Sequence, residues 1–436
     1  MKIYLKNLLK KFTYKIPYPF NSFILRAYEI FFSYKTYFGL PLEYRNIVAA
    51  LNKSKISKTK KNKYNILFYH LTGLSSGGTE KFIQVIAKHL SKVDFNIFFM
   101  YSSIPRKISG NLKLDGRKNY LVDTEDEIHA KLIEFTYSSL ENKYPFVIRD
   151  QKPTIYQVLQ DNKIDLICTA GSGYSEFPIN LIKNIPIVMI NIFGSPSAQP
   201  NIRKQISISQ TVDTAISHIV PQSKREIMYI QSENPKEEYK KLGIELRVKL
   251  GIPKESTVFG RIGRSYDGIF DPIGINAFEN IVKKYPTSHY IIMSPPPILV
   301  KIVKERNIPN IHFLKPSSEE KDIWAFHFSL DTLAHFRLDG ETFGLNIAES
   351  MLAGNSIITH KSHIWNAHLE YLDPSFSFIV EKDDVIGYSR AMETIINQTP
   401  EDRVKMSEQS KKTAQKFFLI EDNIGRIEQI FKDAIL

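Results

Sequence analysis

The sequence predicts an α/β protein with two Rossmann-like, doubly wound parallel sheets that face each other across a cleft. Three observations support this prediction. Short apolar runs alternate with segments of helical periodicity from residue 64 onward, which is typical of βαβ units. The alternation occurs in two sets, separated by a charged and polar stretch at 232–253. At 436 residues, the chain is also long enough to bury two separate cores.

The first set, residues 64–238, is the predicted N-terminal domain. Its strands are expected at 65–70, 95–101, 164–170 and 187–191, and we expect 213–217 to continue this pattern. A Gly/Ser loop at 71–78 leads into a helix near Thr79, which is a good N-cap residue. A further helix is expected at 223–230.

The second set, residues 239–400, is the predicted C-terminal domain. Its strands are expected at 258–261, 289–293, 311–314, 332–335 and 356–359. Its helices are expected near 272–284, 318–326, 345–353 and 383–397, and the tail at 401–436 is also expected to be helical. Doubly wound sheets bind ligands at the carboxyl edge of their strands, so we expect the functional site there.

A basic, aromatic and helical N-terminal extension, residues 1–63 with its linker, precedes the two sets. It holds 14 lysines and arginines against Glu29 and Glu43, which gives +12. The whole chain has 58 basic and 46 acidic residues, again +12, so 64–436 is formally neutral. Helical spacing predicts two apolar faces, one formed by Leu5, Leu8, Leu9 and Phe12 and one by Phe23, Ala27, Ile30, Phe31 and Tyr34.

Basic residues beside aromatic ones suit an anionic membrane surface, which is one expected partner of residues 1–63. Packing of the extension on the folded domains and binding of a protein partner are the alternatives. No known nucleic-acid-binding module is recognisable, so we expect no nucleic acid.

The composition excludes several classes of protein. No run of 18 apolar residues occurs, so no transmembrane helix is predicted. The single cysteine, Cys168, excludes a disulfide framework and a cysteine-based zinc site, and fits a cytoplasmic setting. No pair of histidines or carboxylates has convincing ligand spacing, so we expect neither a metal nor a cofactor. The expected location is the cytoplasm, including the inner face of the membrane.

The segment 340–354, Gly-Glu-Thr-Phe-Gly-Leu-Asn-Ile-Ala-Glu-Ser-Met-Leu-Ala-Gly, carries the clearest chemistry. Gly344 stands directly before a predicted helix, whose first backbone N–H groups favour an anion such as a phosphate. Glu341 in the loop and Glu349 about one turn inside the helix can each accept hydrogen bonds from hydroxyl groups. Such an arrangement suits a nucleotide-sugar.

This segment resembles the Glu-x7-Glu motif of retaining glycosyltransferases with the GT-B fold, in particular family 4 (glycosyl transferases group 1). The resemblance covers about residues 64–420. It implies that Glu341 contacts the donor sugar, that Glu349 contacts the ribose, and that Gly344 and Leu345 offer N–H groups to the diphosphate, beside Phe343. It also implies that the C-terminal helices cross back to the first domain.

Other loops match the family in part. Gly260-Arg261-Ile262-Gly263-Arg264 resembles the family's phosphate grip, but the lysine that usually follows is missing, so either Arg261 or Arg264 is the candidate catalytic cation. Ser294, Pro295 and Lys315 follow two strands where relatives seat the base. Gly77, Gly78 and Thr79 resemble a loop near the diphosphate and the acceptor. Asn191 stands where many relatives carry a histidine that contacts the sugar, and His70, His218 and His335 are the other candidates for this contact.

The resemblance therefore implies a retaining, metal-independent hexosyltransferase. Its donor is a nucleotide-sugar and its acceptor a glycan or lipid-linked molecule, as in the biosynthesis of cell-surface polysaccharide, lipopolysaccharide or glycoconjugate. Two alternatives remain at this point. One is another GT-B enzyme, such as a sugar-nucleotide epimerase. The other is a non-catalytic scaffold that binds a membrane or partner through residues 1–63.

Overall fold

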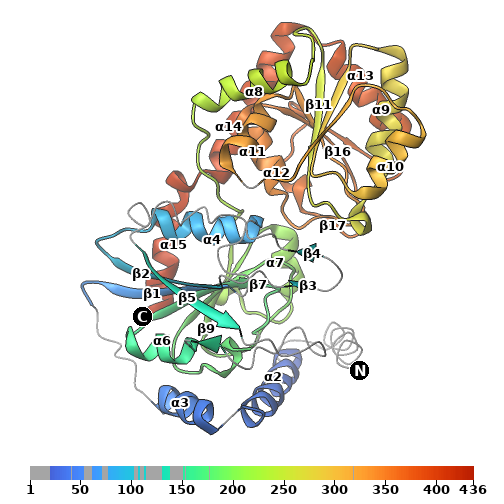
Figure 1. Cartoon of the computed structure of the whole chain (residues 1–436). Helices are drawn as coiled ribbons and strands as arrows, with labels where there is room; N and C mark the ends of the chain where they lie inside the picture. Colours follow the sequence, from blue (N-terminus) through green and yellow to red (C-terminus); the bar gives the residue numbers. More distant parts are fainter. Residues whose placement is uncertain are drawn as a thin grey trace. The chain divides into compact units, whose positions relative to one another are not determined.

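The computed structural model describes residues 20–40, 42–53, 61–70, 77–102, 107–108, 112–113, 130–137, 151–152, 154–175, 177–317 and 319–436. The chain forms two compact units, one of residues 1–230 with 420–436 and one of residues 231–419 (Figure 1). The apolar face predicted at Leu5–Phe12, most of the linker and most of the 71–78 loop lie outside the described residues.

The first unit is built on a sheet of order β10-β9-β8-β7-β1-β2-β5-β6, parallel except for β6. Its strands are β1 (Tyr64–Tyr69), β2 (Phe95–Ser102), β5 (Ala130–Tyr137), β6 (Gln151–Lys152), β7 (Leu166–Gly171), β8 (Ile187–Asn191), β9 (Ile202–Ser207) and β10 (Arg225–Ile227). A separate hairpin pairs β3 (Lys107–Ile108) with β4 (Leu112–Lys113). The helices are α4 (Gly78–His89), α6 (Ile155–Asp161), α7 (Gln210–Ile216) and α15 (Ile420–Ile435).

Two segments of this unit differ from the sequence prediction. Residues 213–216, expected to continue the strands, lie in α7, because the Ser209 hydroxyl accepts the N–H of Val212 and caps a helix. The segment expected to be a helix at 223–230 instead contains β10, a short half-buried strand parallel to β9. Short apolar runs fit either element, and the sheet edge decides here.

The described part of the N-terminal extension forms α2 (Phe20–Phe38) and α3 (Leu42–Lys53). Both helices pack on the first unit. Leu40, Val48 and Leu51 belong to the same buried cluster as residues of α6, β7 and β8. One face of these helices therefore packs on the folded body, as one of the alternatives for the extension expects.

The second unit contains a six-stranded parallel sheet of order β13-β12-β11-β14-β16-β18. Its strands are β11 (Val258–Ile262), β12 (His289–Met293), β13 (Ile311–Leu314), β14 (Thr332–Ala334), β16 (Ser356–His360) and β18 (Ser377–Val380). The strand order reverses between β11 and β14, which is the switch point where such sheets bind ligands.

Helices cover both faces of this sheet (Figure 1). One layer contains α9 (Ile273–Lys284), α10 (Pro297–Glu305) and α13 (Val385–Ile396), and the other α8 (Glu238–Lys249), α11 (Glu320–Phe328), α12 (Leu345–Ala353) and α14 (Pro400–Phe418). Phe259, Phe278 and Tyr290 fill the core beneath the first layer. The predicted fold class, two doubly wound α/β domains, is confirmed for each unit.

The unit boundaries fall at 230/231 and 419/420, where the sequence prediction had 238/239 and 400/401. Helix α14 stays with the second unit because the Ser410 hydroxyl donates to the carbonyl of Asn355 and Phe418 is buried against Phe343. Helix α15 belongs to the first unit, where Phe431 lies against Phe68. Only the second of the two C-terminal helices therefore returns to the first unit.

Candidate active site

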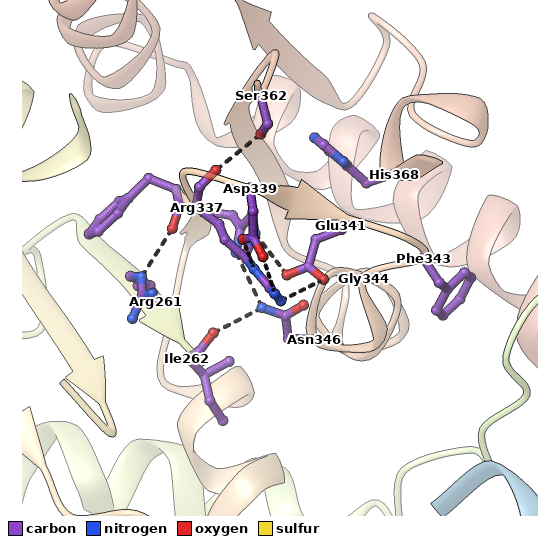
Figure 2. Close-up of polar contacts among 12 residues, drawn as sticks. Arg261, Ile262, Arg337, Asp339, Glu341, Phe343, Gly344, Asn346, Ser362 and His368 are labelled. Carbon is purple, nitrogen blue, oxygen red and sulfur yellow. Dashed lines mark hydrogen bonds and ion pairs between the residues drawn. The ribbon is translucent and has the colours of Figure 1, made fainter. Parts of the chain in front are cut away.

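The site of the second unit lies where β11 and β14 end and α12 begins. The chain leaves β14 at His335 and passes through the two-residue strand β15 (Gly340–Glu341), which pairs with β17 (Trp365–Asn366). It then enters α12 at Gly344. Figure 2 shows how this path gathers Arg261, Arg337, Glu341 and Asn346 around one point.

Glu341 is a carboxylate of the site that two neighbouring side chains hold. Its Oε2 lies 3.2 Å from Nη1 of Arg337, and its Oε1 lies 3.3 Å from Nε2 of His335. Arg337 also binds both carboxylate oxygens of Asp339, at 2.6 and 3.0 Å. Burial alone raises the pKa of Glu341, but the neighbouring His335 and Arg337 outweigh it and hold the pKa at about 2. The carboxylate is therefore ionised at neutral pH.

His335 is neutral and carries its proton on Nε2. Burial lowers its pKa, and Arg261 and Arg337 lower it further against the opposing effect of Glu341. The Asn346 amide nitrogen donates to the carbonyl of Ile262 at 2.9 Å and lies 3.2 Å from Nδ1 of His335. Nδ1 is therefore the acceptor, which leaves the hydrogen on Nε2. This N–H faces Oε1 of Glu341, which lies 3.3 Å from Nε2.

The start of α12 presents unused donors. Gly344 has φ 94° and caps the helix in a left-handed conformation that glycine adopts readily. The Tyr371 hydroxyl donates to the Phe343 carbonyl at 2.6 Å and fixes the turn. Within the described residues, no acceptor takes the N–H of Gly344 or Leu345. The helix start can therefore bind an anion.

The Phe343 side chain takes no part in this surface. It is 1% exposed, and its ring lies 5.6 Å from that of Tyr371 and 5.4 Å from that of Phe418. The sequence placed Phe343 among the donor-binding residues. In the structure its ring anchors the loop in the core, and only its backbone lies at the site.

The two candidate arginines occupy different environments. Arg261 is 1% exposed, stacks on the Phe336 ring at 4.8 Å and donates from Nε to the Phe336 carbonyl at 3.2 Å. Burial lowers its pKa to about 10, and its Nη1 has no partner among the described residues. Arg264 is exposed. Asp267, considered from the sequence as a partner for one of them, instead accepts the N–H of Ile298.

Glu349 is 6% exposed on α12, and its Oε2 lies 3.7 Å from Nε2 of His327 on α11. The predicted ribose contact thus has a protein neighbour in the structure. Ser294 and Pro295 directly follow β12, and Lys315 directly follows β13. These three residues lie along the same carboxyl edge as Arg264, and Lys315 is exposed.

Two candidates lie in the first unit. Asn191 ends β8 and is fully buried, and its side chain donates to the Ser195 carbonyl and accepts the N–H of Gly194, both at 2.9 Å. Both ends of its amide therefore hold a loop. Gly77 precedes α4, and a Cβ at Gly77 would lie 2.0 Å from the carboxylate of Glu80. The carboxylate of Glu80 thus lies at the start of α4, where Gly78 and Thr79 also stand.

Sequence reasoning missed Arg337 and Asn346, and it offered His335 only as one alternative to Asn191 for the contact with the sugar. Arg337 stands four residues before Glu341 in a stretch where polar and apolar residues alternate after an apolar strand, and this spacing is the signal that could have found it. His368 also lies beside the site, and burial lowers its pKa to about 3. Across the described ranges, no group of three histidine, cysteine or acidic side chains is placed to hold a metal ion.

Comparison with solved structures places this chain in a known fold. It matches a glycosyltransferase from Rickettsia africae with TM-score 0.65 and 16% identity, covering 86% of this chain and 99% of the other. HepE of Anabaena, solved with UDP and glucose, matches with TM-score 0.60 and 16% identity over 85% and 99%. WaaG, a glycosyltransferase involved in lipopolysaccharide biosynthesis, matches with TM-score 0.58 and 11% identity over 84% and 99%.

These likenesses show that the chain has the GT-B fold of glycosyltransferases. Comparison with protein-family models finds no match, and comparison with curated protein sequences finds none either.

Proposed function

We propose that this chain is a glycosyltransferase that moves a hexose-type sugar from a nucleotide-sugar to a glycan or lipid-linked acceptor. One observation carries the proposal. An ionised carboxylate, Glu341, is fixed beside a helix start whose N–H groups lack acceptors among the described residues. The carboxylate suits a sugar and the helix start suits a diphosphate, so together they suit a nucleotide-sugar donor.

The donor diphosphate would bind at the start of α12. The N–H groups of Gly344 and Leu345 donate to its oxygens, and Arg264 approaches from the exposed loop after β11. Arg261, which is buried and whose Nη1 has no partner among the described residues, adds positive charge from beneath the site. These groups stabilise the negative charge that builds on the leaving diphosphate, which makes transfer independent of a metal ion.

The donor sugar would lie against Glu341 and His335. The carboxylate accepts hydrogen bonds from sugar hydroxyls and stabilises positive charge at the reacting carbon, while His335 donates from Nε2. Glu349 would reach the ribose, and Ser294, Pro295 and Lys315 would line the base. We propose retention of configuration because the 340–354 segment resembles that of retaining family 4 enzymes.

The first unit would bind the acceptor, with Gly77, Gly78 and Thr79 at its helix start. Asn191 would shape this region through the loop that it holds, because its amide is engaged by Gly194 and Ser195. We propose cell-surface polysaccharide or lipopolysaccharide synthesis as the setting, and the cytoplasm with the inner membrane face as the location. Helices long and apolar enough to cross a membrane are absent from the part of the chain that is described.

A thermal-shift panel of nucleotide-sugars, followed by a transfer assay on the stabilising donors, tests this function. The proposal expects one donor class to stabilise the protein and to be turned over. Glu341→Gln should lower turnover by roughly 100-fold or more while the donor still binds. Glu255→Gln, on an exposed residue of the same unit, is the matched control and should leave turnover unchanged.

Two outcomes would contradict the proposal. Conversion of the free nucleotide-sugar without any transfer would identify an epimerase. Full cellular function of the Glu341→Gln protein, with no donor turnover by the wild type, would identify a scaffold.

A further inference from the structure

Helix α2 is fixed on the first unit by its inner face. The Asn21 side chain donates to the carbonyl of His218, and the Ser33 hydroxyl donates to the carbonyl of Asn180 at 3.1 Å. Glu29 accepts from the Ser197 hydroxyl and from the N–H of Ala198. These contacts run along the helix, so its orientation on the unit is defined.

The opposite face of α2 is apolar and exposed. Its large side chains are Phe23 at 74%, Phe31 and Phe38 at 64%, Tyr34 at 54% and Ile30 at 39% exposure. At helical periodicity these residues, with exposed Ala27, fall within an arc of roughly 100°. From residue 23 to residue 38 this outer face is about 22 Å long.

A contiguous exposed apolar stripe of this length marks an interaction site. It corresponds to the second apolar face that the sequence predicts, but the structure turns that face outward. Leu42, at the start of α3, is exposed as well, at 65%.

Positive charge borders the outer face of α2. Lys35 is exposed on the helix itself, and Lys183 approaches the Tyr34 ring, with Nζ 5.6 Å from its centroid. Arg26, also on α2, lies close enough to Lys224 to interact with it electrostatically, as does Arg203. Helix α2 itself carries Arg26 and Lys35 against one acid, Glu29, which is engaged by Ser197. The surface therefore attracts anions while its centre is apolar.

We propose that the outer face of α2 docks the protein on an anionic lipid surface, with the helix lying parallel to the membrane plane. Aromatic side chains enter the boundary between headgroups and acyl chains, and the lysines and arginines at the border bind the headgroups. A second protein copy would place these like charges against each other, which disfavours self-association. This inference deepens the proposed function, and the idea that the acceptor is lipid-linked rests on that function. Lipid binding by α2 does not itself require sugar transfer.

Vesicle flotation with the full chain tests this inference. We expect the protein to float with phosphatidylcholine vesicles that contain phosphatidylglycerol, to stay behind with phosphatidylcholine alone, and to be released at high salt. The triple variant Phe23→Ser, Phe31→Ser, Phe38→Ser should lose roughly tenfold or more of the bound fraction. The matched control Ile244→Ser, Val248→Ser changes exposed apolar residues of α8 and should bind as the wild type does.

A second variant keeps the test decisive if the triple variant unfolds. Lys35→Glu with Lys183→Glu reverses two exposed charges beside the stripe and should also weaken binding. Binding of the folded triple variant at wild-type level would overturn the proposal. The proposal would also be overturned if the wild type did not bind vesicles but formed a dimer that the triple variant does not form.

Donor turnover separates this inference from the proposed function. The triple variant should turn over a soluble acceptor at the wild-type rate. Lipid binding without any donor turnover would support the docking surface and would contradict the proposed glycosyltransferase activity.

Discussion

Replacement of Glu341 by glutamine should remove an acid-dependent part of the protein's stability. The pKa of Glu341 is lowered from 4.5 to about 2 in the folded protein, because His335 and Arg337 outweigh the effect of burial. A carboxyl whose folded pKa lies below its unfolded pKa stabilises the fold above the unfolded value. That contribution is lost as the pH falls toward the folded value.

The pKa difference sets the size of the effect. At neutral pH, it corresponds to about 3 kcal/mol of unfolding free energy. About 2 kcal/mol of this contribution is lost by pH 3. The glutamine side chain keeps the shape of the carboxylate but has no proton to gain, so the variant should lack this part of the acid dependence.

Urea unfolding of both proteins between pH 7 and pH 3 is the assay. The unfolding free energy of the wild type should fall about 2 kcal/mol further than that of Glu341→Gln over this range. Glu255→Gln should follow the wild type, because Glu255 is exposed. Parallel curves for the wild type and Glu341→Gln would refute the reasoning, because the carboxylate would then not be held by its neighbours.

Three further predictions concern the site and the α2 helix. Gly344→Ala should cost about 1–2 kcal/mol and weaken donor binding in a thermal-shift titration, because φ is 94° and the new Cβ would lie 3.1 Å from the Tyr371 hydroxyl; unchanged binding would contradict this. Arg264→Ala should weaken donor binding without lowering the melting temperature, whereas Arg261→Met should change both, because only Arg261 is buried; equal effects would contradict the assignment. Burial raises the pKa of Glu29 to about 7, so unfolding free energy should fall by up to about 3 kcal/mol as the pH rises from 4.5 through 7, and Glu29→Gln should abolish this fall in urea unfolding; a decline kept by the variant would contradict it.

The sequence was sufficient for the features that depend on local periodicity. The five strands expected in the second unit and the helix at 345–353 have clear apolar patterns, and their expected ranges agree with the structure to within about a residue or two. The sixth strand, β18, was not expected. Glycine at both ends of this helix also marks its limits, since Gly344 and Gly354 both adopt positive φ.

Helices α6, α7, α8 and α10 were missed or assigned as another element, and for three of them the structure shows the physical reason. Helix α8 buries only Tyr239 and Gly243, so its charged sequence was taken as a boundary. Helix α10 begins at Pro297, and the proline run was interpreted as a rigid loop, although proline is favoured in the first turn of a helix. Helix α7 is too short for its periodicity to be distinguished from that of a strand.

The polar network of the candidate site could be predicted only in part. The motif gave Glu341 and Gly344, because their roles depend on neighbours along the chain. The amide of Asn346 contacts Nδ1 of the His335 ring, and this contact exists only after β14 and α12 have packed. Arg261 is similar, since its burial follows from the Phe336 ring that covers it.

The central claim is that the donor diphosphate binds where α12 begins and that Glu341 touches the sugar. A crystal structure with an intact nucleotide-sugar measures this directly. We expect diphosphate oxygens within hydrogen-bonding distance of the Gly344 and Leu345 nitrogens and a sugar hydroxyl on the Glu341 carboxylate. A diphosphate bound elsewhere, with Glu341 still held only by Arg337 and His335, would contradict the account.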